Sequence, residues 1–510
     1  MKMKKIMYIP LDERPCNYNF INVMLKGHDD DIELVEPSLD ILGFKKTPAN
    51  FDALKEFMLE NISDCYGIIL SVDMLLYGGI VPSRLHNFSV SQLVERLRVI
   101  KELKAINPSL KIYAFSLIMR CPQYSSSDEE PDYYEHCGYN IFKYGELTHK
   151  QELGVATEEE IAQIPQHYSW CKDYLADYLN RREVNSDINI IVISLLIEGI
   201  IDFLVFPQDD SSMYGYIKKD QLKIFDHIRN INLDDTLLVY PGADEVGMVL
   251  VSRMINHINN VEPKIYVEYH TENGHLFVPM YEDRAVYKTV KKQLKAAGCV
   301  QVNKISEADG ILMMNNPTLN IDGANITEAM GQCAVLENDV RDIAGFVKRV
   351  KNYIESGYKV SIADVSLINR GDIELVKQLS EEGIYFKLAG YSGWNTSSNT
   401  LGTALTHLVI NINYGFTSSL ATHLALRAYE DIGYCGYTRH YVCENVLPDL
   451  GLNYFDSGMI KGVVSDRVEK EIYSVISEII PEVYENYKIS NCYMPWCRMF
   501  EVALEIDKRD

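Results

Sequence analysis

The stretch TLLVYPGADEVG, residues 236–247, contains the pattern that decides the fold. Its first half is a continuous apolar run, which is typical of a strand buried on both faces of a parallel sheet. Pro241 and Gly242 end this strand, because proline cannot donate to a sheet ladder and glycine permits a sharp turn. Asp244 and Glu245 then stand at the start of the next helix. The stretch is therefore one strand–turn–helix unit.

The same unit recurs along the chain. Six apolar runs precede residue 255 or so, and five follow it. The runs are KIMYIP, DIELVEP, GIILSVD, KIYAFSLI, DFLVFP and TLLVYP, then KIYVEYH, CVQVN, GILMMNN, KVSIADV and YFKLAGY. Amphipathic segments lie between them, and two of these open with capping-box spacing, Ser89 with Gln92 and Thr157 with Glu160. This alternation predicts an α/β protein with parallel sheets.

The number of runs and the 510-residue length indicate more than one domain. We expect an α/β domain over residues 1–255 and a second, Rossmann-like α/β domain over 256–415, each a doubly wound parallel sheet. The alternation of apolar strands and amphipathic helices ends near residue 416, so we expect a mainly helical segment over 416–510. A TIM-like barrel is the alternative for the first domain, because its repeating unit has the same sequence pattern.

The charge balance limits the class of partner. Formal net charge is -23, which repels phosphate backbones and argues against nucleic acid and anionic membranes. The longest apolar run, INIIVISLLIEGIIDFLVF, is interrupted by Glu198 and Asp202 and is too polar for a comfortable membrane span. Eleven scattered cysteines fit a reducing compartment, so we expect a cytoplasmic protein. The oligomeric state is left open.

Polar residues follow most of the first six strands, where the carboxyl ends of parallel strands build sites. We expect them to converge on one acidic pocket that is closed by the second domain. The substrate-binding candidates are Asp12, Arg14, Asn17, Asp73, Tyr77, Arg84, Arg120, Gln208 and Tyr214, together with Trp394, Asn395 and Asn399 of the second domain. Many such residues are ordinary helix caps, and Trp394 is as consistent with a core position as with stacking on a sugar.

Two adjacent acid pairs stand out, Asp209 with Asp210 and Asp244 with Glu245. A helix cap needs one carboxylate, whereas two neighbouring carboxylates repel each other and separate their pKa values into an acid and a base. We therefore take these four as the catalytic candidates.

Several ordered motifs resemble a bacterial family catalogued as a domain of unknown function. They are PLDERP, DMLLYGG with PSR, IDFLVFPQDD with YG, PGADEVG, and GYSGWNTSSNTLGTAL, and they extend from Pro10 to about Leu405. The resemblance implies membership of that family and no particular activity.

PGADEVG is also similar to the Gly-Gly-Asp-Glu signature of family-twenty β-N-acetylhexosaminidases, with Ala243 in place of a glycine. This local resemblance implies that Glu245 is a general acid and that Asp244 orients an acetamido group. Glycoside cleavage needs two carboxyl groups, or one and the amide of the substrate. Our leading hypothesis is therefore a glycoside hydrolase-like enzyme acting on a sugar or amino sugar, without a cofactor.

Two other hypotheses stay open. A divalent metal at the acidic cluster, or at His270, Glu272 and His275, would favour a metal-dependent hydrolase, lyase or isomerase of small polar metabolites. A pair of α/β domains that only binds sugar would be a sensor. The chain has no Walker motif, G-x-G-x-x-G motif or nucleophile elbow, so nucleotide cofactors and serine catalysis are disfavoured.

Overall fold

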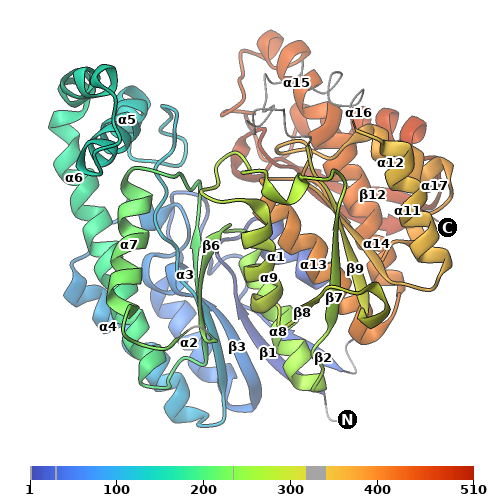
Figure 1. Cartoon of the computed structure of the whole chain (residues 1–510), viewed down its shortest axis with the longest axis horizontal. Coiled ribbons are helices and arrows are strands. Elements are labelled where there is room, and N and C mark those ends of the chain that lie inside the picture. The colour runs from blue at the N-terminus through green and yellow to red at the C-terminus, as the bar shows by residue number, and fades with distance from the viewer. Residues whose placement is uncertain (1–2, 29–30, 234, 318–340, 510) are drawn as a thin grey trace. The chain divides into compact units, whose positions relative to one another are not determined.

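The computed structural model describes residues 3–28, 31–233, 235–317 and 341–509, in which strands and helices alternate (Figure 1). The contacts between residues divide the chain into two compact units. Unit 1 comprises Met1–Glu13, Asp31–Gly247 and Tyr281–Arg284, and unit 2 comprises Arg14–Asp30, Met248–Met280 and Ala285–Asp510. Each unit is therefore built from segments that are not continuous in sequence.

Unit 1 contains a six-stranded parallel sheet with strand order β2-β1-β3-β4-β5-β6. Its strands are β1 (Lys4–Ile9), β2 (Ile32–Val35), β3 (Cys65–Ser71), β4 (Lys111–Phe115), β5 (Phe203–Gln208) and β6 (Leu237–Pro241). β5 and β6 are buried along their whole length, which explains why their sequences are continuously apolar. The order reverses around β1, as in doubly wound folds that bind ligands at the carboxyl ends of their strands.

The helices of unit 1 follow the strands in sequence. They are α2 (Phe51–Asn61), η1 (Ile62–Asp64), α3 (Val72–Tyr77), η2 (Pro82–Arg84), α4 (Val90–Ile106), α5 (Tyr134–Glu152), α6 (Glu158–Ile197) and α7 (Tyr216–Ile228). The predicted capping boxes are both present, at Ser89 for α4 and at Thr157 for α6. These side chains satisfy backbone donors that would otherwise lack partners at the helix start.

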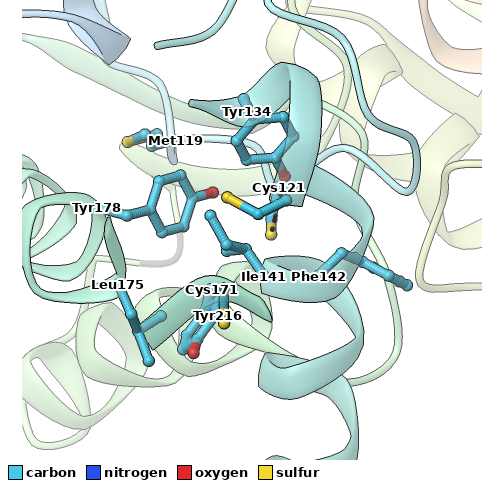
Figure 2. Close-up of a cluster of buried hydrophobic side chains, with 10 residues drawn as sticks. Met119, Cys121, Tyr134, Ile141, Phe142, Cys171, Leu175, Tyr178 and Tyr216 are labelled. Atoms are coloured by element: carbon cyan, nitrogen blue, oxygen red, sulfur yellow. Dashed lines mark hydrogen bonds between the residues drawn. The ribbon is translucent and has the colours of Figure 1, made fainter. Parts of the chain in front are cut away.

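An apolar cluster joins α5, α6 and α7 to the segment after β4 (Figure 2). Its members are Met119, Cys121, Tyr134, Cys137, Ile141, Phe142, Cys171, Leu175, Tyr178 and Tyr216. The Tyr178 hydroxyl donates to the carbonyl oxygen of Arg120 at 3.1 Å, and Arg182 donates to the same oxygen at 2.8 Å. The cluster therefore fixes the backbone of Arg120, whose side chain belongs to the candidate site.

Unit 2 contains a five-stranded parallel sheet with strand order β11-β10-β9-β7-β8. Its strands are β7 (Lys264–Tyr269), β8 (Val300–Val302), β9 (Gly310–Asn315), β10 (Val360–Asp364) and β11 (Gly390–Ser392). In both units the first strand in sequence lies between the second and the third. The order of the strands across the sheet therefore reverses at the first strand in both units, while all strands stay parallel.

The helices of unit 2 come from all three of its segments, and α8 begins in unit 1. They are α1 (Pro15–Leu25), α8 (Val246–Asn259), η3 (Gly274–Leu276), α9 (Val286–Ala296), η4 (Ile305–Glu307), α11 (Ile343–Glu355), α12 (Ile373–Glu381), η5 (Tyr385–Lys387), α13 (Ser397–Tyr414), α14 (Ser418–Arg427), the π-helix η6 (Ala428–Thr438), α15 (Arg439–Asn445), η7 (Pro448–Leu450), α16 (Val463–Ile479), α17 (Pro481–Asn486) and η8 (Pro495–Cys497). Strands β12 (Tyr487–Tyr493) and β13 (Ala503–Lys508) pair antiparallel.

The predicted fold class is confirmed. All eleven expected strands form, in one sheet of six and one of five, and the C-terminal region is mainly helical. The alternative of a barrel for the first domain is wrong, because in the described residues β2 and β6 are the two open edges of the sheet. The β12–β13 pair was not expected. The division at residues 255 and 415 stays a prediction.

In the described part of the chain, no helix combines the length and the apolar character that crossing a membrane requires.

Candidate functional site

Eleven of the predicted site residues belong to unit 1, on the carboxyl side of its strands. They are Asp12, Asp73, Tyr77, Arg84, Arg120, Gln208, Asp209, Asp210, Tyr214, Asp244 and Glu245. Because the strands are parallel, their carboxyl ends lie along one edge of the sheet. Within this edge the side chains form separate groups, and one of the groups is a cluster of arginines and carboxylates.

Arg84 is the first centre of this cluster. It lies in η2, after the turn that Gly78 and Gly79 make with positive φ angles of 88° and 127°. The guanidinium is buried and contacts three carboxylates. It lies 2.7 Å from Asp209, 2.9 Å from Glu129 and 3.4 Å from Glu130. Such a buried guanidinium is stabilised only by close anionic partners.

Arg120 is the second centre, and it shares two of the same partners. Its Nε lies 2.8 Å from Glu130, and its two Nη atoms lie 3.2 Å from Glu129 and 3.2 Å from Asp210. The two arginines therefore bridge Asp209 and Asp210 to Glu129 and Glu130. We call these six residues the arginine–carboxylate cluster.

The four carboxylates of the cluster differ in exposure. Glu130 is buried, and its Oε2 atom has no hydrogen-bond partner among the described residues. The side chains of Asp209 and Asp210 are 18% and 17% exposed and that of Glu129 is 15% exposed, so these three face solvent in front of the arginines. A ligand that reaches the cluster therefore meets carboxylate oxygens first.

Asp210 has a shifted pKa and an uncommon backbone conformation. Burial, and next the neighbouring charge of Asp209, raise the pKa of Asp210 to about 7, while Arg120 and Arg84 oppose the shift. Its backbone has a positive φ of 45°, an uncommon conformation for a residue other than glycine. Asp209 is the anionic partner of Arg84. Both acids of the predicted pair therefore contact an arginine, and Asp210 in addition has a raised pKa.

Asp73 and Tyr77 lie beside the cluster and connect β3 to β4. Asp73 accepts a hydrogen bond from the backbone N–H of Leu117 at 2.8 Å, and burial raises its pKa to about 7. Tyr77 is buried and stacks on the His86 ring at 4.5 Å. Asp12 is buried as well. These contacts give Asp73 and Tyr77 structural roles that support the turn carrying Arg84.

Gln208 belongs to another group, built on the returning segment Tyr281–Arg284. Its side-chain oxygen accepts hydrogen bonds from Gln221 at 2.9 Å and from Arg284, and Arg284 also donates to the Val239 carbonyl at 3.0 Å. Tyr214 is partly buried, with the ammonium of Lys150 5.3 Å from its ring centre. The group ties the ends of β5 and β6 to the segment that closes unit 1.

The side chain of Glu245 stabilises the turn that follows β6. Its side chain is fully buried and folds back, so that Oε2 accepts the backbone N–H of Ala243 at 2.9 Å. Gly242 has a φ of 136°, and a Cβ there would lie 2.1 Å from Glu245 Oε1. Burial raises the pKa of Glu245 to about 8, and Asp244 adds to the shift. The raised pKa favours the protonated carboxyl near neutral pH, and the carboxyl closes its own turn.

The remaining five candidates belong to unit 2. Arg14 is buried 4.4 Å above the ring of Trp496, and Asn17 is also buried. Trp394 is buried, packs edge-on against Phe20 at 5.6 Å and donates to Thr403 at 3.2 Å. These contacts favour the core position for Trp394 over stacking on a sugar.

Asn395 and Asn399 organise the start of α13. The Asn395 side-chain oxygen accepts the Thr396 N–H at 2.7 Å, and the Asn399 amide donates to the Thr396 hydroxyl at 3.0 Å. Asp431, in the π-helix η6, accepts the N–H of Gly393 at 2.6 Å and fixes the preceding turn. The motif GWNTSSNT is thus a helix start with several internal hydrogen bonds.

The described residues contain no group of three or more His, Cys, Asp or Glu side chains arranged to hold a metal ion. His270 pairs with Asn315 at 2.8 Å, and the ring of His275 lies 5.9 Å from that of Tyr269. The cluster instead holds its carboxylates with arginines.

Glu129 and Glu130 are the site residues that the strand-end rule missed. They lie in the loop CPQYSSSDEEPDY, 14 and 15 residues beyond Phe115, the last residue of β4. An acidic run in such a loop normally indicates a solvated surface. The signal that could have found them is the pair of arginines after β3 and β4, which need anionic partners.

The family model described as "Protein of unknown function (DUF4127)" matches residues 6–505. The chain belongs to this family. The resemblance seen in the ordered motifs is thereby confirmed, and it covers nearly the whole chain. No curated protein and no solved structure matches the chain, and the local similarity to β-N-acetylhexosaminidases has no support from these comparisons.

Proposed function

We propose that this member of the family is a glycoside hydrolase-like enzyme that uses carboxylate acid–base chemistry at the arginine–carboxylate cluster. Its substrate would be a sugar or an amino sugar. The observation that carries the proposal is a pair of adjacent, partly exposed acids that two arginines hold. The pKa of Asp210 is raised to about 7 although Arg120 lies 3.2 Å away, and Asp209 lies 2.7 Å from Arg84. Glycosidic cleavage requires one protonated carboxylic acid and one ionised carboxylate.

In this proposal Asp210 donates its proton to the leaving oxygen as the glycosidic bond breaks. Asp209 is the partner carboxylate, which activates water or stabilises the positive charge that develops on the sugar ring. Arg84 and Arg120 hold the two acids in place from behind. The layer of carboxylates in front suits hydroxyl or ammonium donors better than anions.

Asp209 and Asp210 support the proposal better than Asp244 and Glu245. Both side chains of the first pair are partly exposed, whereas Glu245 is fully buried and bonded to its own turn. The reducing cytoplasm stays our expected location, because the ten described cysteines are scattered and none of them forms a disulfide.

Asp210→Asn is expected to lower the hydrolysis rate by about 10²–10⁴-fold, since it removes a positioned proton donor and keeps the shape. Turnover would be measured on a panel of chromogenic glycosides, with and without a chelator. Asp226→Asn is the matched control, because Asp226 is 63% exposed and pairs with Arg229 on α7. Wild-type protein that binds sugars but cleaves none would favour the sensor. Activity that a chelator abolishes would favour the metal-dependent alternative.

The rate should also fall as pH rises through about 7. Asp210 must be protonated to act as the acid, and its raised pKa of about 7 places the loss of that proton there. A pH–rate profile of kcat/KM on the best substrate would show this alkaline limb. A profile that stays flat from pH 6 to about 9 would contradict the role of Asp210.

A further inference from the structure

Unit 1 has an open surface pocket of about 420 Å³ that none of the predicted site residues lines. Its lining residues are Phe44, Lys45, Lys46, Thr47, Ser127 and Asp128. The volume is within the range of small-molecule sites. The pocket lies between two loops of unit 1, one before α2 and the other after β4.

The first loop is a tight and well-supported turn. Phe44 and Thr47 exchange two backbone hydrogen bonds, at 3.0 Å and 2.8 Å. Lys45 has a positive φ of 50°, and its N–H donates to Glu13 at 2.9 Å. Gly43 has a φ of 78°, and a Cβ there would lie 2.3 Å from the Thr47 carbonyl oxygen. The turn therefore presents its side chains in a fixed arrangement.

The second loop connects the pocket to the arginine–carboxylate cluster. The Lys45 ammonium pairs with Asp128, and the next two residues, Glu129 and Glu130, are the carboxylates that hold Arg84 and Arg120. One wall of the pocket and one side of the cluster are thus consecutive residues of the same loop. Asp128, which lines the pocket, directly precedes Glu129 of the cluster in sequence.

The chemistry of the lining fits a sugar ring. Phe44 is 40% exposed and offers an apolar face against which a pyranose ring can pack. Around it, Thr47 and Ser127 offer hydroxyls, Lys46 offers ammonium donors, and Asp128 offers carboxylate acceptors. An apolar face surrounded by hydrogen-bond donors and acceptors is what a polyhydroxylated ring requires.

We infer that this pocket is a second sugar-binding subsite, which holds a ring of an oligosaccharide whose neighbouring part reaches the arginine–carboxylate cluster. The inference rests on the proposed function for the identity of the substrate. It adds that the substrate has more than one sugar ring, and that Phe44 and Lys46 select for chain length.

The test is binding to catalytically silenced protein, so that it does not depend on turnover. Asp210→Asn protein would be titrated by calorimetry with glucose, glucosamine and N-acetylglucosamine, and with the β-1,4-linked di-, tri- and tetrasaccharides of each. We expect Phe44→Ala to weaken the longer ligands by about ten- to a hundredfold and to leave the monosaccharides unchanged, since it removes one aromatic face. Lys46→Met should weaken the same ligands less.

Phe416→Ala is the matched control, because Phe416 is an exposed phenylalanine of unit 2. It should bind all ligands as its parent does. The inference is overturned if no oligosaccharide of the panel binds, or if Phe44→Ala and Phe416→Ala give equal affinities. Tight binding that depends on Phe44 without any hydrolysis by the wild type would sustain the subsite and reject the proposed function.

Discussion

Glu245→Gln is expected to make the protein more stable than the wild type at alkaline pH, by about 5 kcal/mol above pH 8. Burial raises the pKa of Glu245 from 4.5 to about 8. Between these values the folded state keeps a proton that the unfolded state has released, so the free energy of unfolding of the wild type falls as pH rises. A shift of this size corresponds to about 5 kcal/mol. Glutamine mimics the protonated carboxyl and has no proton to lose.

The measurement is urea unfolding of both proteins at several pH values from 5 to 9, followed by circular dichroism. The difference in unfolding free energy should be near zero below pH 5 and should grow through the window up to pH 8. Glu95→Gln is the control, because Glu95 is exposed and pairs with Arg98 on α4. A difference that does not change with pH would show that Glu245 is ionised in the folded protein.

Arg84→Met is expected to destabilise the protein by about 3–5 kcal/mol, the usual cost of breaking a buried ion pair from one side. The substitution leaves the carboxylates of Glu129 and Asp209 without their closest partner, at 2.9 Å and 2.7 Å. Adding Asp209→Asn to this variant should recover part of the loss, because it removes one of the uncompensated charges.

Arg98→Ala provides the control for an exposed arginine, since its side chain is 64% exposed and pairs with Glu95 on the same helix. It should change the free energy of unfolding by less than about 0.5 kcal/mol. If Arg84→Met were equally mild, the arginine–carboxylate cluster would not be a structural centre of unit 1, and the proposed positioning of Asp209 would lose its basis.

The strands were predictable because burial imposes a simple sequence pattern. Strands such as β5 and β9 are buried along their whole length, and their sequences are almost continuously apolar. The edge strands β2 and β8 are more exposed and are recognised by short β-branched runs instead. Strand β12 shows neither pattern, because it is exposed at alternate positions and its sequence YKISNCY contains lysine, serine and asparagine. It follows a helical stretch without a clear turn signal, so the sequence does not distinguish it from the mainly helical segment expected over residues 416–510.

The site was predictable only in part, for a different physical reason. The strand-end rule locates side chains along the sheet, and it selected Arg84, Arg120, Asp209 and Asp210, which do form one cluster. It cannot show which way a side chain turns. Glu245 follows its strand in the same way as Asp210, yet its carboxyl folds onto the N–H of Ala243, two residues before it.

The discontinuous composition of unit 2 has a consequence for how the chain matures on the ribosome. Helix α1 is made early, but its partners in unit 2 come much later: the Met24 carbonyl accepts from Ser419, which is 395 residues further along. At ordinary rates of synthesis this separation corresponds to roughly 20 to 80 s. Throughout that interval Phe20 and its apolar neighbours are without the surface that finally covers them. We therefore expect nascent α1 to keep an apolar face exposed to solvent or to a chaperone until residues near Ser419 have been made.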